Sequence, residues 1–463
     1  MTRKYASDNK MFFIIDTFII LCLILLLMTI PANLFYCYFE PANKNLNNIG
    51  FSLFFVCLTL GFFGLIVPLI IEYKNKSIGF KNIFLIIFIV LFMSNLIAVC
   101  SMPSVVNVQD KVNVTITPLI RFYGIVYGLG FSILPFLVFY VAPKINKKNN
   151  ITTIVLSLNT ILFIVSIIYS LATEWDKYIN YECICSFMAG KCYSHYLIFT
   201  AIGFVVLKFL TNHNRWLLGL IPTTILLIFA QSKITILFYF IFLLYLVILY
   251  CIYLSKKSRK NTYVILLVFG FISVCFILFI PLFVFSNSGI LLKIKNAFGS
   301  LIENASATFN SRTIIWQSSF ALLTPLNYVF GFGQALYYKF VDLSYRNNPN
   351  FPSFEEHTNS LYNAHNAFVG SLGQGGIIFV LINICLYSFI IYASVKCYKK
   401  HKYISLITIY SVVVMLGLGL FEQLSFLTNM GVLAIPMFVW PILSIFYKEY
   451  SNDKLIKFIE LRK

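Results

Sequence analysis

The stretch AHNAFVGSLGQGG, residues 364–376, joins the longest polar segment of the chain to an apolar run. Asn363 or Asn366 can cap the helix that follows, because Asn side chains accept hydrogen bonds from the free N–H groups of a first turn. Glycines at positions 370, 373, 375 and 376 let another helix or a lipid approach the backbone closely. If the protein carries out chemistry, we expect it at this junction of a polar loop with the membrane.

The composition is that of a membrane protein. Of the 463 residues, 60% are hydrophobic and 11% are charged, whereas soluble domains are about 25% charged. Many apolar runs near 20 residues long predict an all-α, polytopic membrane protein. We expect no cleavable signal peptide, because the first apolar run is too long for one. We predict about 12 transmembrane helices, near residues 11–31, 50–71, 82–101, 119–142, 151–171, 194–210, 215–231, 234–254, 262–285, 364–395, 403–421 and 427–447.

The positive charge predicts the orientation of these helices. The net charge is +19, and cytoplasmic loops of membrane proteins collect Lys and Arg. Placing both termini in the cytoplasm puts most basic residues into short cytoplasmic loops, so we expect no nucleic acid partner. The chain then divides into membrane helices 1–9 (residues 1–285), one large extracytoplasmic loop (286–363), and helices 10–12 with a cytoplasmic tail (364–463).

The large loop contains its own folding signals. Asn310 and Ser311 can cap a helix over residues 313–323, which must end before Pro325. The sequence Gly331-Phe332-Gly333 is typical of a tight turn. Loops of this length are uncommon unless they are functional or disordered, and the aromatic residues here indicate an ordered cap on the membrane bundle.

Two residues, one in the large loop and one directly after it, could carry chemistry. His365 could act as a base or hydrogen-bond donor at a reacting hydroxyl, or it could merely lie at the membrane interface. Arg312 could bind a phosphate through its guanidinium fork, or it could pack on Trp316 one helical turn later.

Three further charged residues lie at predicted outer helix ends. Lys233 follows Gln231-Ser232 and could bind a lipid-linked phosphate, or it could extend from the helix end toward the interface. Arg121 has the same two interpretations. Glu422 lies between the last two spans and could pair with a cation from the large loop, or it could be solvated.

A cysteine-rich loop follows the fifth span. Cys183, Cys185, Cys192 and His195 have a spacing that could bind zinc. Extracytoplasmic cysteines tend to pair, so we favour a disulfide from Cys192 to Cys183 or Cys185 over free thiols and over a metal site. The sequence contains no cofactor fingerprint, and we expect no cofactor.

The order of these features resembles the O-antigen polymerase and O-antigen ligase superfamily. The resemblance is carried by Gln231-Ser232-Lys233, by Ser311-Arg312 with Trp316, by the Gly331 turn and by residues 364–376. It covers residues 215–395 in detail. The family usually has Arg at the position of Lys233, so the charge is kept here but the bidentate geometry is not.

The resemblance implies a metal-independent glycosyltransferase of the GT-C type in the bacterial inner membrane, with its active site facing the periplasm. Its donor would be an undecaprenyl-diphosphate-linked oligosaccharide among membrane lipids, and a chain-length regulator is a candidate partner. His365 would orient or deprotonate the acceptor, and Arg312, Lys233 and Arg121 would bind the diphosphate. Trp316 and Asn366 would also contribute to binding the diphosphate or substrate, and Glu422 would support the site. We favour an O-antigen or capsular polysaccharide polymerase over an O-antigen ligase, and both over a flippase of lipid-linked sugars.

Overall fold

The computed structural model describes residues 82–108, 112–145, 150–173, 194–230, 232–255, 323–333, 365–422, 424–426 and 429–460, together with Arg312, Thr313, 315–317, Ser319, Phe320 and Tyr337. The predicted spans 11–31, 50–71 and 262–285, the tip of the large loop and the cysteine-rich loop lie outside these residues. The chain divides into one unit of residues 1–236 and 319–463 and a second unit, Leu237–Ser318, and each is described by itself.

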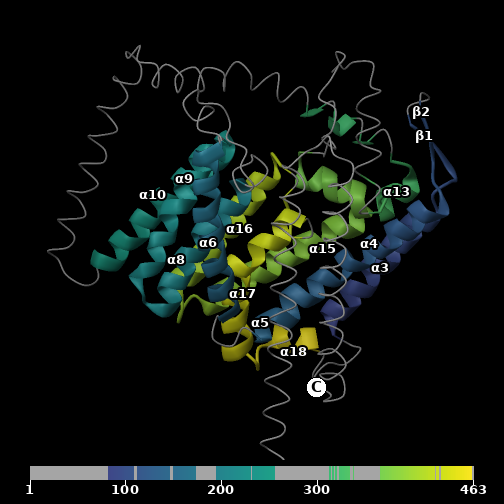
Figure 1. The fold of residues 1–463 in the computed structure, drawn as a ribbon. Helices are drawn as coiled ribbons and strands as arrows, with labels where there is room; N and C mark the ends of the chain where they lie inside the picture. Colours follow the sequence, from purple (N-terminus) through teal and green to yellow (C-terminus); the bar gives the residue numbers. More distant parts are fainter. Residues whose placement is uncertain are drawn as a thin grey trace, which may run out of the picture. The chain divides into compact units, whose positions relative to one another are not determined.

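The described residues form helices and one β-hairpin (Figure 1). In chain order these are α3 (Ile83–Cys100), β1 (Val105–Val108), β2 (Val112–Thr115), α4 (Pro118–Phe136), the π-helix η1 (Leu137–Val141), α5 (Ala142–Ile145), α6 (Asn150–Thr173), α8 (Ser194–Thr211), the 3₁₀ helix η3 (Asn214–Gly219), α9 (Leu220–Ala230), α10 (Lys233–Ser255), α13 (Pro325–Phe330), α15 (Ala367–Cys397), α16 (Lys402–Gly419), α17 (Asn429–Glu449) and α18 (Lys454–Glu460).

Five described helices, α3, α6, α8, α15 and α16, are long and apolar enough to cross a membrane. This confirms a multi-pass helical membrane protein. Every predicted span within the described residues coincides with a helix, but the span at 215–231 is a 3₁₀ turn followed by the short helix α9. The expectation of an all-α fold missed the antiparallel hairpin, in which Val105 pairs with Thr115.

The side chains of α3 show which residue types are buried in the bundle and which are exposed on its surface. Its buried positions include Ser94, Asn95 and Ala98, whereas Ile86, Ile89 and other large apolar residues are exposed. Small and polar residues thus face the bundle, where helices approach closely and polar groups find partners. Asn95 donates to the carbonyl oxygen of Gly124 on α4 at 3.2 Å.

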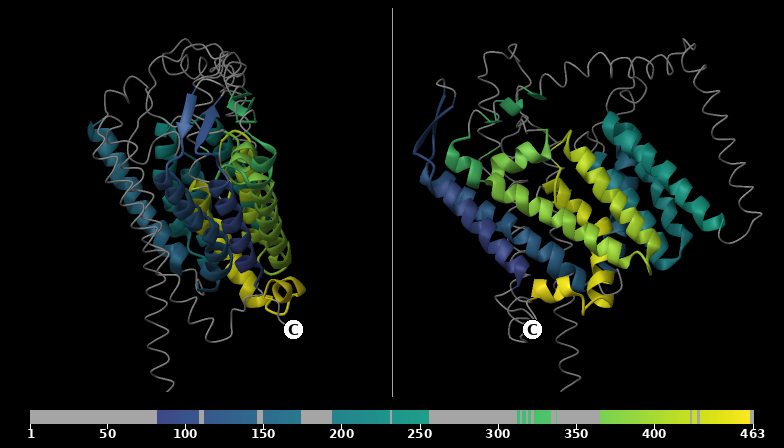
Figure 2. Two further views of the ribbon diagram at one scale, coloured as in Figure 1. Left: turned by 90° about the vertical axis from the view of Figure 1, so that its right-hand side faces the viewer. Right: turned by 180° about the vertical axis from the view of Figure 1, so that it is seen from behind.

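The helix α17 packs against α8, α15 and α16 (Figure 2). It also stabilises the irregular turn at η1, where π-helical geometry and nearby prolines change the backbone hydrogen bonding. The indole N–H of Trp440 donates to the carbonyl of Val138 at 2.9 Å, and the hydroxyl of Tyr447 donates to that of Phe139 at 3.0 Å.

Ion pairs join helices at the end of the bundle that carries α18. Lys396 lies 3.1 Å from Asp453, and Glu449 is bonded to both Lys400 (3.2 Å) and His401 (2.8 Å). The hydrogen bond from His401 is the main reason that the pKa of Glu449 lies below its usual range.

The helix α15 is kinked, although the sequence predicted one continuous span. Gly375 (φ −140°, ψ 16°) and Gly376 (φ 66°, ψ −163°) leave helical geometry. Ser371 and Asn383 would lie about 18 Å apart along a straight helix, yet their side chains are hydrogen-bonded at 3.4 Å. The first part of α15, residues 367–374, therefore folds back against the rest, and we call it the arm.

We predict that Gly376→Ala destabilises the folded protein by about 1–3 kcal/mol or more, because the backbone conformation at Gly376 is essentially restricted to glycine. A Cβ atom there would also lie 2.1 Å from the carbonyl oxygen of Val329. Thermal unfolding of the purified protein in detergent measures the loss.

The matched control is Gly203→Ala in α8, where a Cβ atom would meet only side-chain atoms, at 3.0 Å and beyond. Equal stability losses for the two variants would contradict the proposed strain at Gly376.

Candidate active site

The arm is capped by Asn366, one of the two residues predicted as its helix cap. The Oδ1 atom of Asn366 accepts hydrogen bonds from the N–H groups of Phe368 (2.9 Å) and Val369 (3.0 Å). Its Nδ2 atom donates to the carbonyl of Leu420 at 3.2 Å, just beyond the end of α16. One side chain therefore both caps the arm and ties it to the next helix.

His365 lies directly before this cap and is paired with Glu422. The Nδ1 atom of His365 lies 2.9 Å from Oε2 of Glu422, and the side chains are 34% and 25% exposed. An ionised Glu422 accepts the Nδ1 proton, which makes Nε2 the basic nitrogen of the ring. The sequence left open whether Glu422 pairs with a cation from the large loop or is solvated. In the structure, the partner of Glu422 is His365.

The backbone at His365 is also unusual. Its φ is 43°, in the left-handed region that few residues other than glycine adopt. Such a conformation costs about 1–3 kcal/mol and persists only where the surroundings enforce it. The Asn366 cap and the Glu422 contact supply that restraint, so the imidazole is held in a defined place.

The other end of the arm is held by the predicted tight turn at Gly331. The N–H of Phe332 donates to the carbonyl of Gly373 at 2.8 Å, and that of Gly333 donates to Gln374 at 3.0 Å. A helix end leaves carbonyl groups without partners, and this turn supplies two donors for them. Gly331 has φ 74°, and a Cβ atom there would lie 2.5 Å from the backbone of Gln374.

Two neighbouring side chains complete this contact. Asn327 donates from Nδ2 to the carbonyl of Gly331 at 3.0 Å and forms a capping box with Thr324 at the start of α13. The ring of Tyr337 lies where a Cβ atom of Gly373 would be. Burial raises the pKa of Tyr337, so its hydroxyl stays protonated and donates to Ser319 at 3.3 Å.

Arg121 has an observed structural role. Its guanidinium donates to the carbonyls of Val99, Cys100 and Met102. These groups lie at the end of α3, where carbonyls need donors. The geometry matches helix-end capping, and a diphosphate role for Arg121 stays a prediction.

The remaining predicted residues are placed less fully. Arg312 and Trp316 lie in the second unit, on helical backbone and partly exposed, as the loop-helix prediction requires. Lys233 is the first residue of α10, and the structure describes its backbone only.

The predicted disulfide stays a prediction, because Cys183, Cys185 and Cys192 lie outside the described residues. His195 is buried near the start of α8, and no metal-binding group of three His, Cys, Asp or Glu occurs among the described residues.

The fold and this site define a multi-pass helical membrane protein whose polar loop contacts a kinked helix. Residues 217–384 match the family model described as O-antigen ligase. This match confirms the resemblance to the O-antigen polymerase and ligase superfamily, and it includes Lys233, Arg312, the Gly331 turn and His365. Searches against curated proteins and against solved structures gave no match.

We predict that Asn366→Ala lowers the free energy of unfolding by about 1–2 kcal/mol, because it removes a helix cap. Asn366→Asp should lose less, since a carboxylate still caps the arm but cannot donate to Leu420. Thermal unfolding measures both changes.

Asn82→Ala is the matched control, because Asn82 is a buried Asn that caps α3 in the same way. It should cost a similar amount. An Asn366→Ala protein as stable as the unchanged protein would show that this cap does not hold the arm.

Proposed function

We propose that the protein is an O-antigen or capsular polysaccharide polymerase. It joins polyprenyl-diphosphate-linked oligosaccharide repeat units by inverting, metal-independent glycosyl transfer. The observation that carries this proposal is the His365–Glu422 pair at 2.9 Å, located just before the arm at the edge of the polar loop. His365 itself lies within the residues that match the O-antigen ligase family model.

The chemistry follows from this pair. An acceptor hydroxyl attacks the anomeric carbon of the donor, and the bond from that carbon to the lipid diphosphate breaks. His365 takes the hydroxyl proton at Nε2, and Glu422 stabilises the imidazolium that forms. The lipid diphosphate leaves with the electron pair, so the donor needs no further activation.

The departing diphosphate needs cations. Arg312 offers a bidentate fork for phosphate oxygens, with Trp316 beside it, and Lys233 offers a point charge at the start of α10. Arg121 is the weakest candidate, because its guanidinium already binds three backbone carbonyls.

The proposal includes an architecture for the whole chain. About 12 spans of GT-C type place both termini in the cytoplasm of a bacterium and the segment 286–363 in the periplasm. That segment excludes water from the reaction at the outer face of the inner membrane. A chain-length regulator is a candidate partner.

The second candidate is an O-antigen ligase, which would transfer the finished glycan to the lipid A core. The specific observation in its favour is the description of the matching family model. The two activities share donor and chemistry and differ in the acceptor, so His365 and Glu422 would have the same roles in both.

We predict that His365→Ala lowers glycan elongation by about 10²–10⁴-fold, the usual contribution of a general base. Glu422→Gln should lower it less, because the amide still contacts the imidazole but no longer stabilises its charge. Chain-length ladders on gels, normalised to the protein in the membrane, measure both effects.

Among the described residues, a second His–Glu pair provides a matched control: His401 and Glu449, at 2.8 Å on the opposite end of the bundle. His401→Ala and Glu449→Gln should leave elongation within about twofold. Normal ladders in His365→Ala would show that His365 is not catalytic.

We predict that deletion of the gene leaves a single repeat unit on the lipopolysaccharide core, because a polymerase acts before ligation. A lipopolysaccharide gel with analysis of lipid-linked sugars measures this. Bare core with accumulated lipid-linked polymer would instead show a ligase, and repeats retained in the cytoplasmic leaflet would show a flippase.

A further inference from the structure

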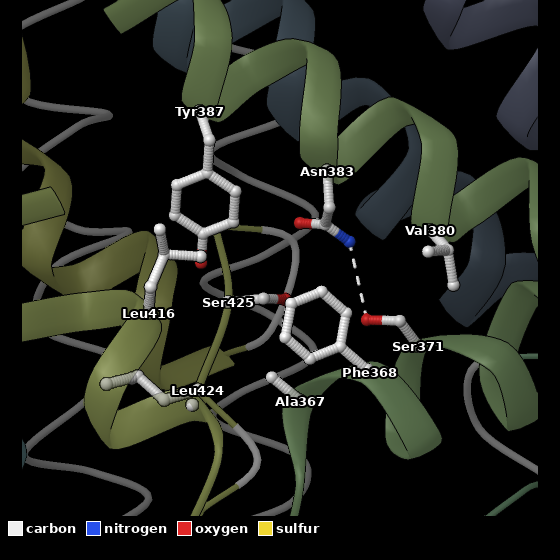
Figure 3. A pocket seen from close by; sticks show the side chains of 10 residues that line it. Ala367, Phe368, Ser371, Val380, Asn383, Tyr387, Leu416, Leu424 and Ser425 are labelled. Atoms are coloured by element: carbon white, nitrogen blue, oxygen red, sulfur yellow. Dashed lines mark hydrogen bonds between the residues drawn. The ribbon is translucent and has the colours of Figure 1, made fainter. Parts of the chain in front are cut away.

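The two ends of the bundle differ in what they offer to a ligand. Near the arm, the space between the side chains of Phe368, Ser371 and Asn383 has room for about one water molecule (Figure 3). A sugar or lipid group therefore does not fit in that space. The opposite end, which carries α18 (Figure 1), instead presents exposed charged and aromatic side chains.

The helix α18 is held on the bundle by Asp453, the residue directly before it. The Oδ1 atom of Asp453 accepts hydrogen bonds from the N–H group of Leu455 and from the hydroxyl of Tyr392 on α15, both at 2.9 Å. Its Oδ2 atom lies 3.1 Å from Nζ of Lys396, also on α15. Ile456 is 1% exposed, and α18 packs against α3. Because a helix this short is not stable alone in water, these contacts fix its position and leave one of its faces outward.

That outward face carries two lysines and a phenylalanine. Lys454, Lys457 and Phe458 have the spacing i, i+3 and i+4, which places them on one side of a helix. All three side chains are exposed, and Phe458 is 57% exposed. The ion pairs that the described residues form at this end use other cations. Both lysines can therefore bind an anion from outside the bundle.

Further cations lie at the same end of the bundle. Lys399, Lys402 and Lys448 are located at the ends of α15, α16 and α17. The carboxylates of Asp453 and Glu449 are already bound by cations. The described residues thus give this end a net positive charge, which attracts an anionic partner.

Phe458 indicates which kind of anion fits this face. A large exposed aromatic ring adds nothing to the binding of a small soluble anion, whereas aromatic rings beside lysines are typical of helices that lie in the membrane interface. There the ring is buried at the boundary of headgroups and acyl chains, and the lysine ammonium groups extend to the phosphates. Only residues 450–453 separate α18 from the bundle helix α17, which keeps α18 close to the membrane surface.

We propose that the outward face of α18 binds anionic phospholipids. The ammonium groups of Lys454 and Lys457 contact the lipid phosphates, and the ring of Phe458 lies among the adjoining glycerol and acyl groups. With both termini in the cytoplasm, these lipids belong to the cytoplasmic leaflet, whose surface is negative. Through Asp453, the bound lipids also fix the end of α15 at that surface.

The test replaces Phe458 with the photoreactive p-benzoylphenylalanine in the full chain, reconstituted into vesicles of equal parts phosphatidylglycerol and phosphatidylcholine. After irradiation, lipid adducts are identified by mass spectrometry. We expect adducts with both lipids and about fivefold more with phosphatidylglycerol, because each lysine near an anionic surface adds attraction. Salt at about 1 M should bring the two yields close together, since it screens exposed charges.

Two double variants separate the charge of the lysines from their other properties. Lys454→Gln with Lys457→Gln should keep the lipid adducts but bring the ratio of the two lipids close to one. Lys454→Arg with Lys457→Arg is the matched control, which keeps the charge and should keep the ratio. Thermal unfolding in a neutral detergent should be the same for both, because neither lysine is part of the ion pairs that hold α18.

The absence of lipid adducts would overturn the proposal, because it would show that residue 458 faces water. Equal yields of the two lipids in the chain with both lysines, or the same excess of phosphatidylglycerol in the Gln variant, would also overturn it. In membranes taken from cells, an adduct with another polypeptide in place of lipid would show a protein partner instead.

Discussion

The contact between two glycine motifs is the constraint on which the rest of the site depends. Gly331 and Gly376 both adopt backbone conformations with positive φ. Neither has room for a Cβ atom, because Gly331 lies against the backbone of Gln374 and Gly376 against that of Val329 at the end of α13. The kink frees carbonyl groups that lipid cannot satisfy. The N–H groups of Phe332 and Gly333 satisfy two of them, so the reversal of α15 and the turn of the polar loop stabilise each other.

The sequence predicted the components of this contact but not the contact. Gly331-Phe332-Gly333 was predicted as a turn and Asn366 as a cap, because both depend on residues close in the chain. The same is true of the helix positions, which follow from apolar runs. The kink was missed because glycines within an apolar run are common in membrane helices, and only a partner more than 40 residues away decides their conformation.

In the candidate site too, features that depend on the order of residues along the chain were predicted, and contacts between distant residues were not. His365 and Arg312 were selected because of their order along the chain, whereas Glu422 had two open interpretations. Its pairing with His365 could not be predicted, since it depends on where α16 ends relative to the arm. Arg121 illustrates the opposite case, because a basic residue at a helix end is equally suited to phosphate and to carbonyls. The bond from Asn383 to Ser371 on the arm had no sequence signal, because a single Asn in a membrane helix can bond its own backbone.

The two His–Glu pairs in the described part of the chain show why geometry beyond the pair itself indicates function. His401 and Glu449 are as close as His365 and Glu422, but Glu449 also binds Lys400 at a helix end far from the arm. His365 instead has a positive φ and lies beside a cap that ties the arm to α16. Strain of this kind is retained where the surrounding structure enforces it, typically at functional sites. The arm holds this imidazole at the junction of loop and membrane, where an acceptor hydroxyl and a lipid-linked donor can meet.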